Sequence, residues 1–125
     1  MKTRVLVAED NKDMLELLCL WLERLNYEVI GAKDGIEAVE LATSETLDLI
    51  IMDIVMPKLS GLEAASQIKN NPETQDIPIL AVSGMAQPRD RKKGVQTVCD
   101  GYVAKPFTFQ NLEAAIKRLL KNSST

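Results

Sequence analysis

Four short apolar runs in this sequence each end abruptly at a polar side chain. The runs and the residues that follow them are Val5 to Ala8 before Glu9 and Asp10, Leu49 to Met52 before Asp53, Ile79 to Val82 before Ser83, and Tyr102 to Ala104 before Lys105. The carboxyl ends of parallel strands meet at one edge of a sheet, and ligands bind in the crevice there. If the runs are neighbouring parallel strands, the pattern predicts a reaction site built from carboxylates, a hydroxyl and an ammonium.

Apolar periodicity alternates between the strand and the helix pattern along the chain. Strands are predicted over residues 4–8, 28–32, 48–53, 79–82 and 101–104, and helices over 12–25, 35–43, 60–70, 89–96 and 109–121. Ser60 with Glu63 has the spacing of a capping box, Asp34 with Glu37 repeats it, and Thr108 precedes the last helix. The sequence therefore consists of strand and helix units that alternate up to a polar tail at 122–125.

Continuous apolar runs such as residues 49–52 suit central parallel strands that helices cover on both faces. Residues 27–30 form the least uniformly apolar strand, which predicts an edge position. No G-x-G-x-x-G follows the first strand, and the right-handed crossover rule leaves few topologies. We therefore predict an α/β fold, a doubly wound, flavodoxin-like, five-stranded parallel sheet of order 2-1-3-4-5 with helices on both faces.

The composition bounds the class of protein. At 125 residues, 46% of them hydrophobic, the chain can bury a real core. We expect residues 1–125 to be a single domain with a disordered tail at 122–125 and no second domain attached. The formal charge of −3 argues against nucleic-acid and membrane-surface partners, which require a basic face.

Cysteine and histidine usage narrows the chemistry. Cys19 and Cys99 lie far apart without a C-x-x-C spacing, so we interpret them as reduced thiols. The amino terminus lacks the apolar core of a signal peptide and no run approaches membrane-spanning length, which favours a cytoplasmic location. The absence of histidine from the sequence excludes imidazole catalysis, histidine metal ligation and a phosphohistidine on this chain.

The predicted crevice requires a cation. Glu9, Asp10 and Asp53 would lie at adjacent strand ends, and two carboxylates about 4 Å apart repel by about 4 kcal/mol at an effective dielectric constant of about 20. Oxygen ligands in a partly open site suit Mg²⁺, which commonly bridges carboxylates to a phosphoryl group. Lys105 adds a positive charge and Ser83 a hydroxyl donor. These parts indicate a phosphoryl-transfer site, where positioning and charge neutralisation supply most of the catalysis.

Four motifs in this chain resemble the response-regulator receiver family. They are E-D-N at residues 9–11, M-D-I-V-M-P with S-G over 52–61, V-S-G at 82–84 and Y-V-A-K-P-F at 102–107. Each follows a predicted strand, and the resemblance covers essentially the whole chain. It implies a single-domain response regulator of a two-component or phosphorelay system. Such a protein is a phosphoacceptor switch rather than an enzyme, with self-catalysed phosphorylation and dephosphorylation only.

The resemblance implies an acceptor and a metal site. Asp53 would take a phosphoryl group from a phosphohistidine on a histidine kinase or a histidine phosphotransfer protein. Mg²⁺ would be held by Asp10 and Asp53, by Glu9 directly or through water, and by the backbone carbonyl of Val55.

The resemblance also implies phosphoryl-binding groups and a switch. The groups are the Lys105 ammonium, the Ser83 hydroxyl and the backbone amides of Val55 and Gly84. The bond from Lys105 to the following proline would be cis. On phosphorylation the Ser83 hydroxyl would move toward the phosphoryl group and vacate space for the ring of Tyr102, although a static aromatic at Tyr102 is the alternative.

An output surface follows from the same resemblance. It would comprise the helix at 89–96, the strand at 101–104 and the helix at 109–121, and it would bind a downstream protein target. The chain would act as a monomer or as a phosphorylation-linked dimer. We interpret the basic cluster over residues 89–93 as a solvated helix face.

The helix predicted at 12–25 carries two apolar stripes. The stripe expected to face the core consists of Met14, Leu17, Leu18, Trp21 and Leu25. The second stripe, on a neighbouring face, consists of Leu15, Cys19 and Leu22. By resemblance, receivers dock their phosphodonors beside this helix, so we predict a docking patch at the second stripe. Deeper burial of the same residues is the alternative.

Two other functions stay open. A haloacid-dehalogenase-like phosphatase also uses an aspartate nucleophile after a parallel strand, but its signature needs an acid two residues later, where this chain has Val55. A phosphorylation-independent interaction module is the other alternative. Degenerate receivers of that kind typically lose an acid or the lysine, and this chain keeps them all.

Overall fold

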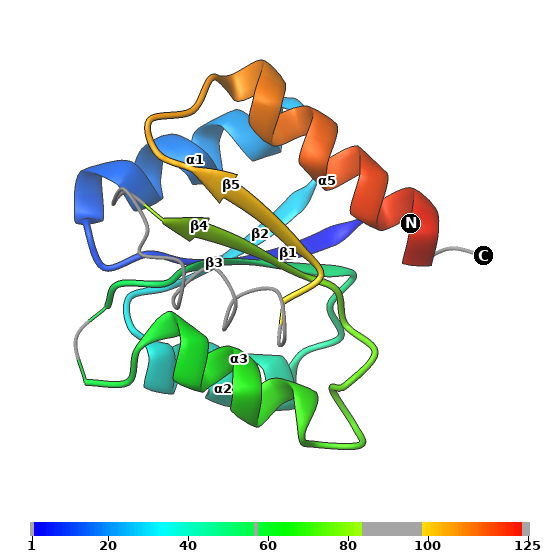
Figure 1. Cartoon of the computed structure of the whole chain (residues 1–125). Coiled ribbons are helices and arrows are strands. Elements are labelled where there is room, and N and C mark those ends of the chain that lie inside the picture. Colours follow the sequence, from blue (N-terminus) through cyan, green and yellow to red (C-terminus); the bar gives the residue numbers. More distant parts are fainter. Residues whose placement is uncertain (1, 57, 84–98, 124–125) are drawn as a thin grey trace.

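The computed structural model describes residues 2–56, 58–83 and 99–123. Its strands are β1 (Arg4–Ala8), β2 (Glu28–Ala32), β3 (Leu49–Asp53), β4 (Ile79–Ser83) and β5 (Gly101–Ala104). Its helices are α1 (Lys12–Arg24), α2 (Gly35–Ser44), α3 (Gly61–Lys69) and α5 (Phe109–Ser123). The strands form one parallel sheet of order β2-β1-β3-β4-β5 (Figure 1), which confirms the predicted fold class.

Helices cover both faces of the sheet, with α1 and α5 above it and α2 and α3 below it in Figure 1. Because successive side chains of a strand point to opposite faces, β3 serves both layers. Leu49 and Ile51 belong to the core under α1 and α5, and Ile50 and Met52 to the core over α2 and α3. Every residue of β3 and β4 is buried, whereas in β2, at the edge of the sheet, only Ala32 is buried.

The predicted helix caps are present. The Ser60 hydroxyl accepts from the Glu63 amide at 3.2 Å, and the Ser60 amide donates to the Glu63 carboxylate at 3.3 Å, so the capping box is complete. Asp34 accepts from the Glu37 amide at 2.8 Å and Thr108 accepts from the amide three residues further on. Each cap satisfies an amide that has no partner within its own helix.

The core-facing side of α1 differs from the prediction. Leu18 and Leu22 are 3% and 0% exposed, and Leu15 packs against the same core, whereas Leu17 and Leu20 are 47% and 61% exposed. The docking patch is therefore wrong at Leu22, and the predicted core stripe is wrong at Leu17. Leu15, Leu18 and Leu22 follow the three- and four-residue spacing of one helix face. Because α1 has leucines on several sides, its sequence is compatible with more than one buried face. Packing against the sheet determines which face is buried.

The remaining predictions concern the end of the chain, the cysteines and the residues before β5. α5 extends to Ser123, into the segment predicted to be a disordered tail. Cys19, the third member of the predicted docking patch, is half-buried, and both it and Cys99 are free thiols. Gly84 and the helix predicted at 89–96 lie outside the described residues. None of the described helices has the length and apolarity that crossing a membrane requires.

Candidate functional site

The candidate site lies at the carboxyl edge of the sheet. β3 ends at Asp53 and β4 at Ser83, and the parallel register places Ser83 beside Ala104, the last residue of β5. Lys105 is the next residue along the chain, and Glu9 follows the last residue of β1. The shared direction of the strands therefore brings residues from four distant parts of the sequence to one edge.

Three carboxylates and one ammonium meet at this edge. One oxygen from each of Glu9, Asp10 and Asp53 lies within 4.8 Å of the others. The Lys105 Nζ is 3.0 Å from the Glu9 Oε1 and 3.5 Å from the Asp53 Oδ2. Glu9 and Asp53 are 3% and 6% exposed, whereas Asp10 is exposed. A buried pair of acids thus shares a single cation, with a third acid at the mouth.

Burial and neighbouring charges shift the pKa values of Asp53, Glu9 and Lys105. Burial, together with the nearby charge of Glu9, raises the pKa of Asp53 to about 6, although the Lys105 ammonium opposes the rise. Burial also disfavours the Glu9 anion, but the Asn11 amide and Lys105 overcome that effect and hold the pKa of Glu9 below its usual value. The two carboxylates raise the pKa of Lys105 against the effect of burial. Glu9 is therefore the paired anion, and Asp53 carries the uncompensated cost of ionisation.

Backbone amides fix both buried acids. The Asn11 amide donates to the Glu9 Oε2 at 3.0 Å, and the Asn11 side chain in turn caps α1 by accepting from the Met14 amide at 3.0 Å. The Val55 amide donates to the Asp53 Oδ1 at 3.1 Å. Sequence reasoning assigned no role to Asn11, although asparagine before an apolar periodic run is a recognised helix start.

The donor set fits a divalent cation. Glu9, Asp10 and Asp53 supply carboxylate oxygens, the ligands that Mg²⁺ prefers, and Asp10 leaves one side open to solvent and so to bound water. Lys105 brings one positive charge against three acids, two of which are buried. A second cation at the cluster would offset the repulsion that remains.

The residues predicted as the switch flank this cluster. Ser83 is 1% exposed, and its carbonyl accepts from the Lys105 amide at 2.6 Å. The peptide bond between Lys105 and Pro106 is cis, as the resemblance implied. Tyr102 is half-buried and packs against Ile54 and Ala81. The hydroxyl and the aromatic ring therefore come from neighbouring strands, with Ala81 opposite Tyr102 in the register.

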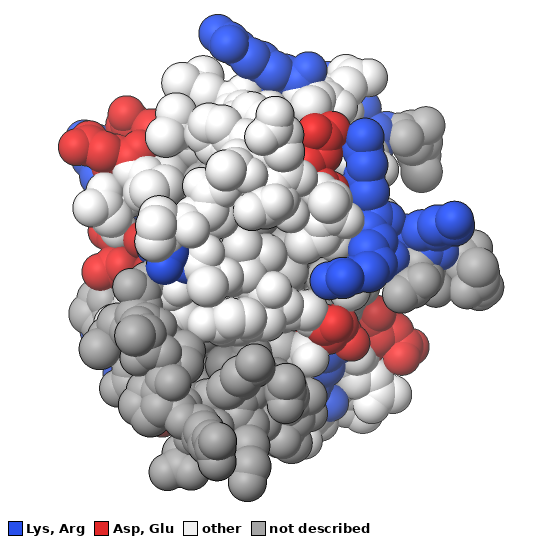
Figure 2. All heavy atoms as spheres, turned by 45° about the horizontal axis from the view of Figure 1, so that its top comes forward, with Lys and Arg blue, Asp and Glu red and all other residues white. Residues whose placement is uncertain are grey.

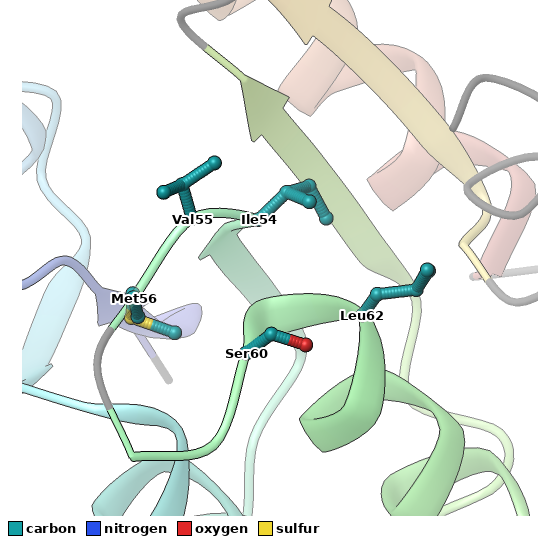
Figure 3. Close-up of a pocket in the computed structure, with 5 residues that line it drawn as sticks. All are labelled: Ile54, Val55, Met56, Ser60 and Leu62. Carbon is teal, nitrogen blue, oxygen red and sulfur yellow. The ribbon is translucent and has the colours of Figure 1, made fainter. Parts of the chain in front are cut away.

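A shallow apolar pocket of about 230 Å³ lies beside the acids rather than over them. It is lined by Ile54, Val55, Met56, Ser60 and Leu62, from the β3–α3 connection and the start of α3 (Figure 3). The Val55 side chain is 48% exposed, while the Val55 amide contacts Asp53. This apolar pocket therefore borders the site, and the carboxylates and Lys105 lie next to it.

The chain belongs to the response-regulator receiver family. Residues 5–117 match the family described as "Response regulator receiver domain". The sheet order, the acidic cluster and the lysine after β5 agree with this assignment. Receiver domains are phosphoacceptor switches and not enzymes of the usual kind, so the phosphatase alternative is not favoured.

Curated relatives and a solved structure agree with this assignment. The chain is 35% identical over 123 residues to the alkaline phosphatase synthesis transcriptional regulatory protein PhoP of Bacillus subtilis, covering 98% of the chain and 50% of PhoP. It is 35% identical over 120 residues to the polar-differentiation response regulator DivK of Brucella anthropi, covering 96% of the chain and 98% of DivK. The chain thus spans half the length of one relative and nearly all of the other.

The solved structure is that of the response regulator TrrA from Thermotoga maritima in complex with Mg(2+)-BeF. It superposes with a TM-score of 0.83 at 36% identity, covering 95% of this chain and 99% of that one. The similarity supports the fold, and TrrA is a protein of this family that binds Mg²⁺.

Proposed function

We propose that Asp53 is the phosphoacceptor of this receiver domain and takes its phosphoryl group from a phosphohistidine on a histidine kinase or a histidine phosphotransfer protein. The observation that carries the proposal is a cluster of three carboxylates in which two, Glu9 and Asp53, share one ammonium at 3.0 Å and 3.5 Å. Such a cluster has too little positive charge when empty and can accept both a cation and a phosphoryl group.

The Asp53 carboxylate acts as the nucleophile. One of its oxygens forms a bond to phosphorus as the bond from phosphorus to the donor imidazole nitrogen breaks, and the electron pair of that bond stays on the nitrogen. The Val55 amide orients the carboxylate, and the Lys105 ammonium is placed to pair with phosphoryl oxygens. The same arrangement supports self-catalysed reaction with a small phosphodonor.

Glu9, Asp10, Asp53 and the Val55 carbonyl would hold the Mg²⁺ ion. When bound, the ion supplies positive charge to the phosphoryl oxygens and to the acids. The Ser83 hydroxyl, with the amides of Val55 and Gly84, would bind the remaining phosphoryl oxygens.

A change at Ser83 would reach the output surface through Tyr102. Tyr102 belongs to β5, and its ring packs against Ile54, the residue that follows β3. A phosphorylation-dependent turn of this ring would alter the proposed output surface of β5, α5 and the helix predicted at 89–96. That surface would bind the downstream target or a second phosphorylated copy. The described part of the chain includes β5 and α5 but not the helix predicted at 89–96.

The corrected α1 surface offers a place for the phosphodonor. Leu17, Leu20 and Phe109 are 47%, 61% and 40% exposed, and Trp21 stacks on Phe109 with ring centroids 4.9 Å apart. In Figure 2, where the top of Figure 1 comes forward, the middle of the face shown carries few charged side chains. An apolar surface of this kind indicates a protein contact.

This surface is continuous with the acceptor site. A cavity of about 400 Å³ is lined by Met14, Leu17, Lys105, Pro106, Phe107 and Phe109. A partner bound in this cavity would therefore lie next to Lys105 and Pro106. We infer that the phosphodonor docks here, on Leu17, Leu20 and Phe109.

Mass spectrometry tests the acceptor. Incubation with acetyl phosphate and Mg²⁺ should add the mass of one phosphate, and Asp53→Asn should abolish the gain. Sustained turnover of phosphate esters would favour a phosphatase, and no gain would favour an inert interaction module. We also propose that residues 1–125 function as a single domain. A mass gain in the 125-residue chain on its own would support this.

Leu17→Glu tests the docking surface, and Ile36→Glu is its matched control. Both side chains are 47% exposed, but Ile36 lies on α2, on the other face of the sheet. Leu17→Glu should slow transfer from a phosphohistidine protein and leave labelling by acetyl phosphate unchanged. Equal transfer rates for the two variants would contradict docking on α1.

A further inference from the structure

The connection from β3 to α3 packs so closely against the first turn of α2 that a side chain does not fit there. A Cβ atom on Gly35 would lie 2.2 Å from the carbonyl oxygen of Leu59 and 2.9 Å from its carbonyl carbon. No glycine of the described residues has a positive φ, so the contact, and not the backbone conformation, requires glycine at this position. Because the opposing atoms are backbone, a methyl group at Gly35 must displace the connection itself.

A second glycine joins the same connection to the phosphoacceptor. A Cβ atom on Gly61 would lie 2.0 Å from the carbonyl oxygen of Asp53, and the Gly61 amide donates to the Ile54 carbonyl at 2.9 Å. Leu59, which contacts α2, is separated from Gly61 by Ser60, the N-cap of α3. The first turn of α2, the β3–α3 connection and the backbone of Asp53 are therefore in contact one after another.

The first turn of α2 is itself tied down. Asp34, its N-cap, is 6% exposed, and its Oδ1 accepts from the Glu37 amide at 2.8 Å. The other oxygen, Oδ2, is 3.6 Å from the Nζ of Lys58, a residue of the β3–α3 connection. One carboxylate thus fixes the start of the helix and pairs with the connection that rests on it.

We propose that Gly35 is a positioning residue for the phosphoacceptor site. The first turn of α2 sets the path of the β3–α3 connection, and that path places the Val55 amide 3.1 Å from the Asp53 carboxylate (Figure 3 shows the connection). The proposal rests on the proposed function. It adds that the geometry of the metal and phosphoryl site depends on an α2 contact outside the acidic cluster.

Gly35→Ala, compared with Gly31→Ala, tests the proposal. The atoms nearest to a Cβ atom on Gly31 would be Leu15 side-chain atoms at 3.5 Å or more, an ordinary contact, so Gly31→Ala is a matched control. Calorimetric titration should show Mg²⁺ binding weakened about tenfold in Gly35→Ala, as is typical when outer-shell support of a metal site is lost. The control should bind Mg²⁺ like the wild type.

Hydrogen exchange of the apo protein supplies a readout that does not depend on Mg²⁺. In Gly35→Ala the amides of Val55 and Gly61 should exchange faster, while amides of β1 and β4 keep their rates. A uniform rise across the sheet would indicate global destabilisation and overturn the proposal. Unchanged exchange and unchanged Mg²⁺ affinity in a folded Gly35→Ala protein would also overturn it.

Asp34 provides a second pair of variants if Gly35→Ala does not fold. Asp34→Ala removes the cap and the Lys58 pair, whereas Asp34→Ser keeps a capping oxygen. Asp34→Ala should accelerate exchange of the Val55 amide and weaken Mg²⁺ binding more than Asp34→Ser does, and equal values in both variants would refute the proposal. If the wild type gained no phosphate, the proposed function would be contradicted. The hydrogen-exchange experiment would still test the role of the contact between α2 and the β3–α3 connection, because it does not depend on phosphorylation.

Discussion

The two edges of the sheet differ in how their charges are matched. At the amino edge the Arg4 guanidinium has a partner for each of its nitrogens: Nε is 2.6 Å from Glu28, Nη2 is 2.9 Å from Glu45, and Nη1 donates to the Thr46 carbonyl at 2.8 Å. At the carboxyl edge, three acids lie together, and two of them, Glu9 and Asp53, share the ammonium of Lys105. The Arg4 guanidinium is therefore fully paired, whereas the three acids at the carboxyl edge outnumber the ammonium that pairs with them.

A second cation at the amino edge repeats the pattern of saturation. The Lys69 Nζ is 2.8 Å from the Asp100 Oδ2 and 2.8 Å from the Ile77 carbonyl oxygen. The same Asp100 oxygen accepts from the Ile79 amide at 2.8 Å, so the pair joins α3 to the starts of β4 and β5. Paired charges of this kind connect elements of the fold. Buried charges that lack enough opposite charge indicate a site where a bound ligand supplies it.

Lys105→Met should produce the largest effect, because it removes the cation that Glu9 and Asp53 share. We expect phosphorylation by acetyl phosphate to slow by about a hundredfold, the usual consequence of losing a charge-stabilising group. The rate of mass gain measures the effect. Since the fold would retain α5 and β5, circular dichroism checks that the variant is folded. A rate within twofold of the wild type would show that the ammonium at this edge is dispensable.

Asp53→Asn should stabilise the apo protein at neutral pH. The pKa of Asp53 is raised from 3.8 to about 6, so the folded state binds more protons than the unfolded state between those values. Stability therefore falls as pH rises through this window, by about 3 kcal/mol in total. Asparagine removes the penalty. In urea titrations without Mg²⁺, the variant should exceed the wild type by this order at pH 7.5 and match it at pH 4.

Addition of Mg²⁺ reverses the expected order at pH 7.5, because only the wild type keeps the full set of acids. A wild type as stable as Asp53→Asn without Mg²⁺ at pH 7.5 would mean that burial of the acids carries no penalty.

The smallest effect is expected at the matched edge. Arg4→Gln removes a guanidinium whose partners can all return to water, since exposed pairs contribute little. The variant should show a small fall in Tm, with unchanged Mg²⁺ affinity and an unchanged phosphorylation rate. A loss of Mg²⁺ binding in this variant would break the distinction between the two edges.

The sequence was sufficient to predict the sheet and the position of the acids. Continuous apolar runs suit strands covered on both faces, and a parallel register carries the residue after each run to the same edge. Asp53 and Lys105 are 52 positions apart, yet their side chains approach to 3.5 Å for this reason. The pattern of apolar runs and the parallel topology of the sheet are therefore enough to predict that Asp53 and Lys105 lie close together.

Features that depend on tertiary packing could not be predicted. Leucines lie on several sides of α1, and the choice of Leu22 rather than Leu17 for the core depends on how the helix rests on the sheet. The contact of Gly35 with the Leu59 carbonyl depends on the path of a connection between two other elements. The periodicity of the sequence describes single helices and strands. It cannot predict the burial of Leu22 or the contact between Gly35 and Leu59, because both depend on how different elements pack against one another.

Magnesium titration of the ¹⁵N-labelled protein, followed by amide resonances, tests the contrast between the edges most directly. The account predicts saturable shifts at Asp10, Asp53 and Val55 and unchanged positions at Arg4 and Asp100. Shifts at the amino edge, or no shifts at the carboxyl edge up to millimolar Mg²⁺, would contradict it.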